Sequence, residues 1–169
     1  MKNYLFLILL VFVVLGCNHK TENEALPSNN WQAMKWTESL SDSLVSGSTY
    51  LSVYSHIYST TEHKTHDLTA TVSIRNINKQ DTIFVKNASY YDTKGNLIRT
   101  YFNSPIFVKP MQTIEIVIDE KDKSGGSGAN FVFDWLVSKQ SNKPYFEGVM
   151  ITTYGQQGLS FTTRGIEIE

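Results

Sequence analysis

The segment from Asp119 to Asn130 has the most unusual chemistry in the sequence, because acidic side chains lead into Ser-Gly-Gly-Ser-Gly. The glycines could let backbone N–H groups converge on an anion, whereas the carboxylates could offer oxygen ligands to a cation. The alternative is a flexible turn between two strands, since Gly and Ser commonly mark loops. The candidate ligand-binding residues here are Asp122, Ser124, Gly125, Gly126, Ser127, Gly128 and Asn130.

Three more polar side chains complete this candidate set. Gln156, Gln157 and Arg164 lie on one predicted turn and strand. Together with Asn130 they would form a polar patch if the loops cluster at one end of the domain.

A nucleophilic serine is the least favoured chemistry for the glycine-rich segment. Ser127 lies in Gly-Gly-Ser-Gly-Ala, which departs from the G-x-S-x-G elbow at its last position. The elbow also needs a helix after the serine, and the residues that follow indicate a strand. A hydrolase is therefore the third hypothesis, and it requires a histidine within hydrogen-bond reach of Ser127.

Three histidines lie close together in the sequence, at His56, His63 and His66. If a hairpin folds the last two back on the first, three imidazoles could hold zinc or copper. The alternative is that His63 and His66 are exposed in a polar loop and that His56 is a hydrogen-bonded side chain among tyrosines. A metal-binding protein is the second hypothesis for the function. The leading hypothesis, a non-enzymatic binding or structural module, requires no cofactor.

Cys17 is the only cysteine, and it follows a segment that differs from the rest of the chain. A positively charged start precedes an apolar run from Tyr4 to Leu15, which is shorter than the roughly 20 residues of a membrane-spanning helix. Residues 1–16 are therefore predicted to be a signal peptide. A single cysteine also excludes an internal disulfide and a cysteine-rich zinc site.

The residues Val14-Leu15-Gly16-Cys17 resemble the lipobox of bacterial lipoproteins. The resemblance implies cleavage after Gly16, a diacylglyceryl thioether on Cys17 and acylation of the new amino terminus, commonly as palmitate. The alternative is a conventional signal peptide with an incidental cysteine. We therefore expect an exported protein with a lipid anchor in a bacterial cell membrane, the outer membrane where the cell has one, facing the periplasm or the exterior.

Charge does not favour a nucleic-acid partner. The chain has 15 basic and 16 acidic residues and a formal net charge of -1. Nucleic-acid-binding domains normally carry a basic patch or stripe. The membrane is the partner that the sequence predicts, and a protein, glycan or small-molecule partner is left open.

The elements that must position these residues are short strands. Apolar side chains recur with a period of two from Tyr50 onward, and Gly95 marks a hairpin turn between two such runs. No βα alternation is present. The pattern predicts an all-β, immunoglobulin-like antiparallel β-sandwich over residues 49–169, with a small barrel as the second choice. Residues 17–48 are expected to form the lipidated start, a tether and a short helix or irregular segment.

Several segments also resemble the bacterial family catalogued as domain of unknown function 3124. The likeness spans about Tyr50 to Gly165 and implies an exported single-domain protein without an established activity. It is carried by residues 53–58, 67–76, 90–92, 120–131 and 155–165. The leading hypothesis is a non-enzymatic, lipid-anchored binding or structural module of the cell envelope.

Overall fold

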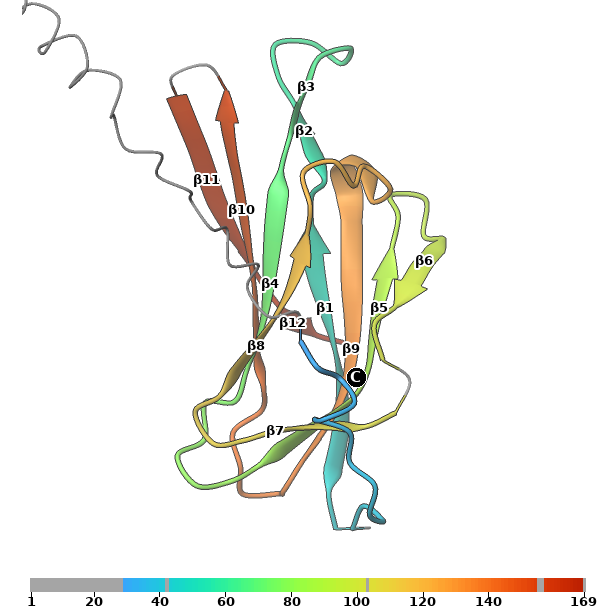
Figure 1. Ribbon diagram of the computed structural model, residues 1–169, viewed down its shortest axis with the longest axis vertical. Helices are drawn as coiled ribbons and strands as arrows, with labels where there is room; N and C mark the ends of the chain where they lie inside the picture. Colours follow the sequence, from blue (N-terminus) through green and yellow to red (C-terminus); the bar gives the residue numbers. More distant parts are fainter. Residues whose placement is uncertain (1–28, 42, 103, 155–156, 169) are drawn as a thin grey trace, which may run out of the picture.

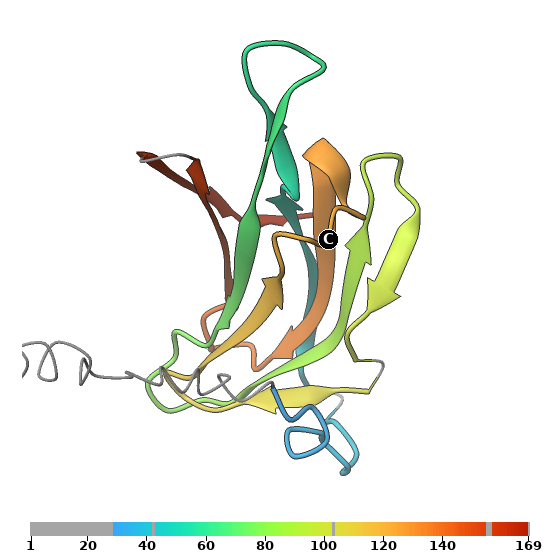
Figure 2. The same cartoon turned by 45° about the horizontal axis from the view of Figure 1, so that its top comes forward.

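Two antiparallel sheets pack face to face in the computed structural model (Figure 1). The structure describes residues 29–41, 43–102, 104–154 and 157–168. The predicted signal peptide, Cys17, most of the predicted tether and Gln156 lie outside the described residues. Figure 2 shows the sheets as separate layers, with one hairpin rising above them.

The first sheet has the strand order β12-β1-β9-β5-β6, and β7 also pairs with β5. Its long central strand is β9, which pairs along its whole length with β1. Two short strands pair with the same edge of β5. Strand β7 pairs with the first half of β5, and β6 pairs with the second half. The strands are β1 (Val45–Val53), β5 (Ile83–Tyr91), β6 (Leu97–Thr100), β7 (Ile106–Val108), β9 (Ala129–Val137) and β12 (Ile166–Glu167).

The second sheet has the order β11-β10-β4-β8, so its strands at both edges have one partner each. The described strands therefore form a sandwich, as the period-two pattern predicts, and the small barrel is wrong because neither sheet closes. The strands are β4 (Thr69–Arg75), β8 (Thr113–Ile118), β10 (Tyr145–Tyr154) and β11 (Gln157–Arg164). A separate hairpin pairs β2 (His56–Tyr58) with β3 (Thr65–Asp67), and a 3-10 turn, η1, spans Gly126–Gly128.

The core lies between the two sheets and follows the alternation of the strands. In β9 every second side chain is buried, from Ala129 to Val137. Phe133 of β9 stacks on Phe146 of β10 with ring centroids 4.4 Å apart, which joins the two layers. The same ring also stacks on Phe131 at 5.3 Å. Aromatic rings therefore form the centre of the core, where each buries a large apolar area.

In strand β5 the residues that face the core are odd-numbered in the first half and even-numbered in the second half. Ile83 and Val85 are buried in its first half, whereas Ala88 and Tyr90 are buried in its second half. The register against β9 shifts between Val85 and Asn87, which is the mark of a β-bulge. The extra residue lets both halves of the strand face the core.

Residues 29–36, called the amino-terminal segment below, are irregular and lie against the first sheet. Residues 31–34 form a turn, and Lys35 makes an isolated bridge to Ile106. In the described residues 31–41 and 43–44 the backbone forms turns, a bridge and a bend and contains no helix. Strand β1 begins at Val45, a few residues before the predicted start of the domain. Among the described residues, none of the helices has the length and apolar character that crossing a membrane requires.

Candidate functional site

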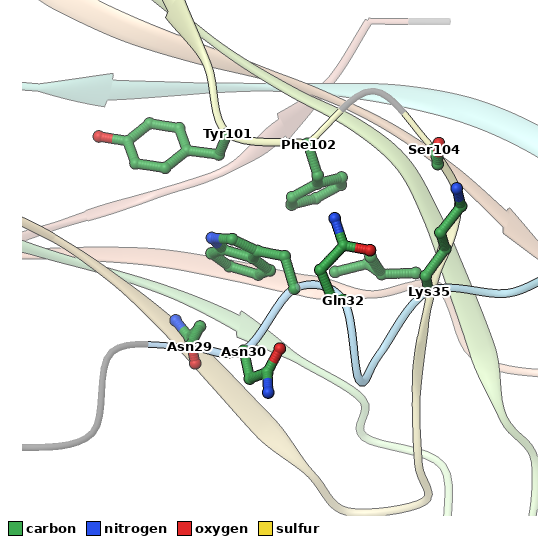
Figure 3. A pocket seen from close by; sticks show the side chains of 9 residues that line it. Asn29, Asn30, Gln32, Lys35, Tyr101, Phe102 and Ser104 are labelled. Atoms are coloured by element: carbon green, nitrogen blue, oxygen red, sulfur yellow. The ribbon is translucent and has the colours of Figure 1, made fainter.

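A cavity of about 590 Å³ lies where the amino-terminal segment meets the connection between β6 and β7 (Figure 3). Its volume is within the roughly 300–1,000 Å³ of small-molecule sites. Its lining combines aromatic rings, amides, the hydroxyl-bearing side chains of Tyr101 and Ser104, and one cation. The lining residues are Asn29, Asn30, Trp31, Gln32, Lys35, Tyr101, Phe102, Ser104 and Ile106.

Backbone hydrogen bonds hold one wall of this cavity in place. The Trp36 N–H donates to the carbonyl of Pro105 at 2.8 Å, and the Phe107 N–H donates to the carbonyl of Met34 at 3.0 Å. The Trp36 ring then packs edge-on against Phe84 of β5 at 5.0 Å. The segment that carries the cavity residues is therefore fixed to the first sheet on both sides of Lys35.

Aromatic contact closes the inner side of the cavity. Trp31 and Phe102 have ring centroids 5.0 Å apart and planes tilted by 42°. Both rings pack against the core, and Phe102 is 8% exposed. Figure 3 shows Phe102 and Gln32 pointing toward one another, with Tyr101 directed to the side. The cavity thus has an apolar inner side and polar side chains around it.

The glycine-rich segment precedes the first residue of β9 and is hydrogen-bonded to neighbouring loops. The Thr93 hydroxyl donates to the carbonyl of Gly125 at 3.0 Å and accepts from the Gly128 N–H at 3.0 Å. The Gly126 carbonyl accepts from the Ser55 N–H at 3.0 Å, and the Gly126 N–H donates to Lys123. These bonds tie the segment to the β5–β6 turn and to the connection between β1 and β2. The segment is a connection between two strands, β8 and β9, and its backbone is hydrogen-bonded to two neighbouring loops.

The acidic part of this segment is also engaged within the protein. Asp122 Oδ1 accepts from the Ser124 N–H at 3.1 Å, and its other oxygen pairs with Arg99 of β6. Burial opposes ionisation of Asp122, but the hydrogen bonds from Ser124 and the Arg99 guanidinium outweigh it and lower the pKa of the carboxyl. Lys123 forms an ion pair with Asp67 at 2.7 Å. These charges fasten the segment to β6 and β3.

Two residues of the predicted polar patch, Gln157 and Arg164, lie at opposite ends of β11. Gln157 and Arg164 are the first and last residues of β11, so the strand separates them. Arg164 Nε donates to the Tyr145 hydroxyl at 3.1 Å, beside a cavity of about 180 Å³. Gln157 lines a different cavity of about 170 Å³ together with His66. Asn130 lies in β9 opposite Tyr91. Gln157 and Arg164 therefore do not share one loop cluster, because one strand separates them.

The three histidines all lie on or beside the β2–β3 hairpin. His56 is paired with Asp67, and His66 is paired with Ile57. Since neighbouring residues of a strand point to opposite faces, His56 and His66 lie on opposite faces of the hairpin. His63, beyond β2, contacts Glu62 at 3.3 Å. Within the described ranges, no group of three or more His, Cys, Asp or Glu side chains is arranged to hold a metal ion.

Ser127 lies in η1, which leads directly into β9. A nucleophile elbow needs a strand-to-helix turn, and here a strand follows the serine. The turn that a nucleophile elbow requires is therefore not formed at Ser127.

Buried Tyr90 and half-buried Tyr101 predict loss of stability at alkaline pH. Burial raises the pKa of Tyr101 to about 12 and raises the pKa of Tyr90 in the same direction. Unfolded tyrosine ionises near pH 10, so the stabilisation is complete below pH 10 and is lost as the pH rises to about 12. Urea unfolding at pH 9 and pH 11.5 should show this loss, and the loss should be smaller in Tyr101→Phe. Equal losses in both proteins would contradict the assignment to Tyr101.

Comparison with known proteins gives the family of this chain. The family described as "Protein of unknown function (DUF3124)" matches residues 46–168. The chain belongs to the DUF3124 family. The match covers the sandwich from β1 to β12 and agrees with the resemblance noted in the sequence. It begins after the residues from 29 to 35 that line the cavity of about 590 Å³, so that wall lies outside the matched part of the DUF3124 domain.

The DUF3124 protein is also similar to one solved structure, "Crystal Structure of Thermotoga maritima 1070". The TM-score is 0.45 at 7% sequence identity, over 71% of this chain and 92% of that chain. No curated protein matches the chain.

Sequence reasoning missed the cavity of about 590 Å³ because its walls are far apart in the chain. Trp31 and Lys35 precede the sandwich, whereas Phe102 and Ser104 lie between β6 and β7. The available signal was the density of Trp31, Met34 and Trp36 in a segment without strand alternation. Such apolar side chains outside a strand or helix need a surface to pack on.

Proposed function

We propose that this DUF3124 protein is a non-enzymatic, lipid-anchored binding module of a bacterial cell envelope. Cys17 would carry the lipid, and the cavity beside Trp31 would hold the ligand. The observation that carries the proposal is the joining of these two features in one short stretch of chain. Asn29 is the first residue that lines the cavity. A fully extended chain from Cys17 to Asn29 would span at most roughly 40 Å.

The composition of the cavity supports binding of a ligand. A small-molecule site typically combines aromatic and apolar side chains with a few polar groups that orient the ligand. The cavity has Trp31 and Phe102 on one side and amide side chains beside them. A purely structural module would gain nothing from an exposed cation and amides grouped around two rings.

Membrane fractionation tests the lipid anchor. The wild-type chain should sediment with membranes and enter the detergent phase, because several acyl chains give an attachment much stronger than one myristoyl chain. Cys17→Ser removes the sulfur and should move nearly all of the exported protein to the soluble fraction. Ser28→Ala, a change in the same amino-terminal region, is the matched control and should remain with the membrane. An unchanged membrane fraction in Cys17→Ser would refute the anchor.

A further inference from the structure

We infer that the cavity beside Trp31 binds a saccharide that bears a carboxylate group. This inference rests on the proposed function only in treating the protein as a binding module, and it does not require the lipid anchor. Three features of the cavity lead to this ligand class: the accessible Trp31 ring, the amide side chains, and a lysine that has no ion-pair partner among the described residues.

The Trp31 indole suits the apolar face of a sugar. The faces of aromatic rings are negative, and they attract the weakly positive C–H groups that line one side of a pyranose ring. Phe102 is buried against Trp31, with ring centroids 5.0 Å apart, so Phe102 supports the indole and Trp31 supplies the ring surface that a ligand can contact. Trp31 is only partly buried, which leaves part of the indole accessible from the cavity.

The amides suit the hydroxyl groups of a sugar. Each amide offers N–H donors and a carbonyl acceptor, which matches hydroxyls that both donate and accept. Asn29 and Asn30 already make one bond each within the protein, to the Glu115 carbonyl and from the Ala33 N–H, and these bonds orient them. Gln32 is exposed beside Trp31. An acyl chain would leave all of these groups without partners, so a purely apolar ligand is disfavoured.

The cation selects a ligand with negative charge. Lys35 is exposed and has no ion-pair partner among the described residues, whereas Lys123 and Lys143 are each paired with a carboxylate. No acidic side chain lines the cavity. Figure 3 shows Lys35 extending toward Ser104, at the end of the cavity away from Asn29 and Asn30. A carboxylate at the Lys35 end would form a charge-assisted hydrogen bond while the hydroxyls face the asparagines.

Binding of trigalacturonic acid to the full chain in detergent tests the inference. The methyl ester of the same trisaccharide is the matched ligand control, since it keeps the rings and hydroxyls but loses the charge. We expect calorimetry to show binding of the acid, at least tenfold weaker binding of the ester, and weaker binding of the acid at high salt. Equal binding of acid and ester, or no binding of either, would overturn the inference.

Substitutions of residues that line the cavity test whether the acid binds there. Lys35→Gln should weaken binding of the acid about tenfold and leave binding of the ester unchanged. Trp31→Ala should weaken both, and Trp31→Phe should restore part of the affinity because it keeps an aromatic face. Lys139→Gln, on the loop between β9 and β10, is the matched charge control and should bind like wild type. Unchanged affinity in Lys35→Gln and Trp31→Ala would place the sugar elsewhere and overturn the inference.

This experiment is independent of the anchor. Loss of binding in the cavity variants leaves the membrane fraction unaffected, because Cys17 is intact in all of them. Conversely, Cys17→Ser should bind the acid with unchanged affinity. A failed anchor test with intact sugar binding would overturn only the proposed attachment, and a failed sugar test with intact anchoring would overturn only the ligand class.

Discussion

Phe133→Ala should lower the free energy of unfolding by about 3–5 kcal/mol, the usual cost of removing a buried ring. Phe133 is fully buried in β9 and stacks on Phe131 in the same sheet and on Phe146 in the other. The change therefore opens a cavity at the contact between the two layers. Native domains are stable by about 5–15 kcal/mol, so the loss is a large part of the total.

Urea unfolding followed by the fluorescence of Trp135 measures this effect, since that indole is 1% exposed and lies in the same strand. Val117→Ala is the control, because Val117 is 59% exposed on β8 and surface changes usually stay within about 0.5 kcal/mol. A loss for Phe133→Ala as small as that for Val117→Ala would contradict the central place of this ring.

Gly125→Ala should lower the free energy of unfolding by about 3 kcal/mol through steric overlap. A Cβ at Gly125 would lie 2.0 Å from the Tyr90 hydroxyl and 2.7 Å from the Ala129 Cβ. The backbone at Gly125 has φ -71° and ψ -33°, which any residue can adopt. The loss therefore reports the close packing of the glycine-rich segment and not a special conformation.

Two control glycines separate these causes. Gly95 has φ 83° and no atom within 4 Å of an added Cβ, so Gly95→Ala should cost roughly 1–2 kcal/mol from conformation alone. Gly158 has open surroundings, its nearest atom being 4.0 Å away, and its replacement should cost less than either.

A second substitution tests whether the Tyr90 hydroxyl is the group that clashes. Tyr90→Phe removes the oxygen and should recover part of the stability in the Gly125→Ala background, although alone it costs about 1 kcal/mol for the bond to Ser55. Strict additivity of the two changes in a double-mutant cycle would contradict the close contact.

The strands could be predicted because their side chains alternate. In β8 and β9 every second residue is buried, and Gly95 adopts the positive φ that the hairpin turn requires. The bulge in β5 could not be predicted, since the change of parity after Val85 depends on pairing with β9. A local pattern therefore determines which residues form strands, and the partner strand determines the register.

The candidate sites were harder to predict because they depend on distant contacts. The glycine-rich segment suggested a ligand loop, but its polar groups are bonded to Thr93 and Ser55, which are remote in sequence. The cavity is formed by Trp31 and Phe102, which become neighbours only in the folded chain. Composition indicates which side chains can bind a ligand, and only the fold shows which of them are already engaged.

The most direct test of the account is the mass of the amino-terminal peptide of the membrane-extracted protein. A lipid-anchored binding module requires a mature chain that begins at Cys17 and carries a diacylglyceryl thioether. Tandem mass spectrometry of that peptide should show the lipid on the cysteine and no residue of the apolar run. A peptide that begins elsewhere, or one in which Cys17 has a free thiol, would contradict the account.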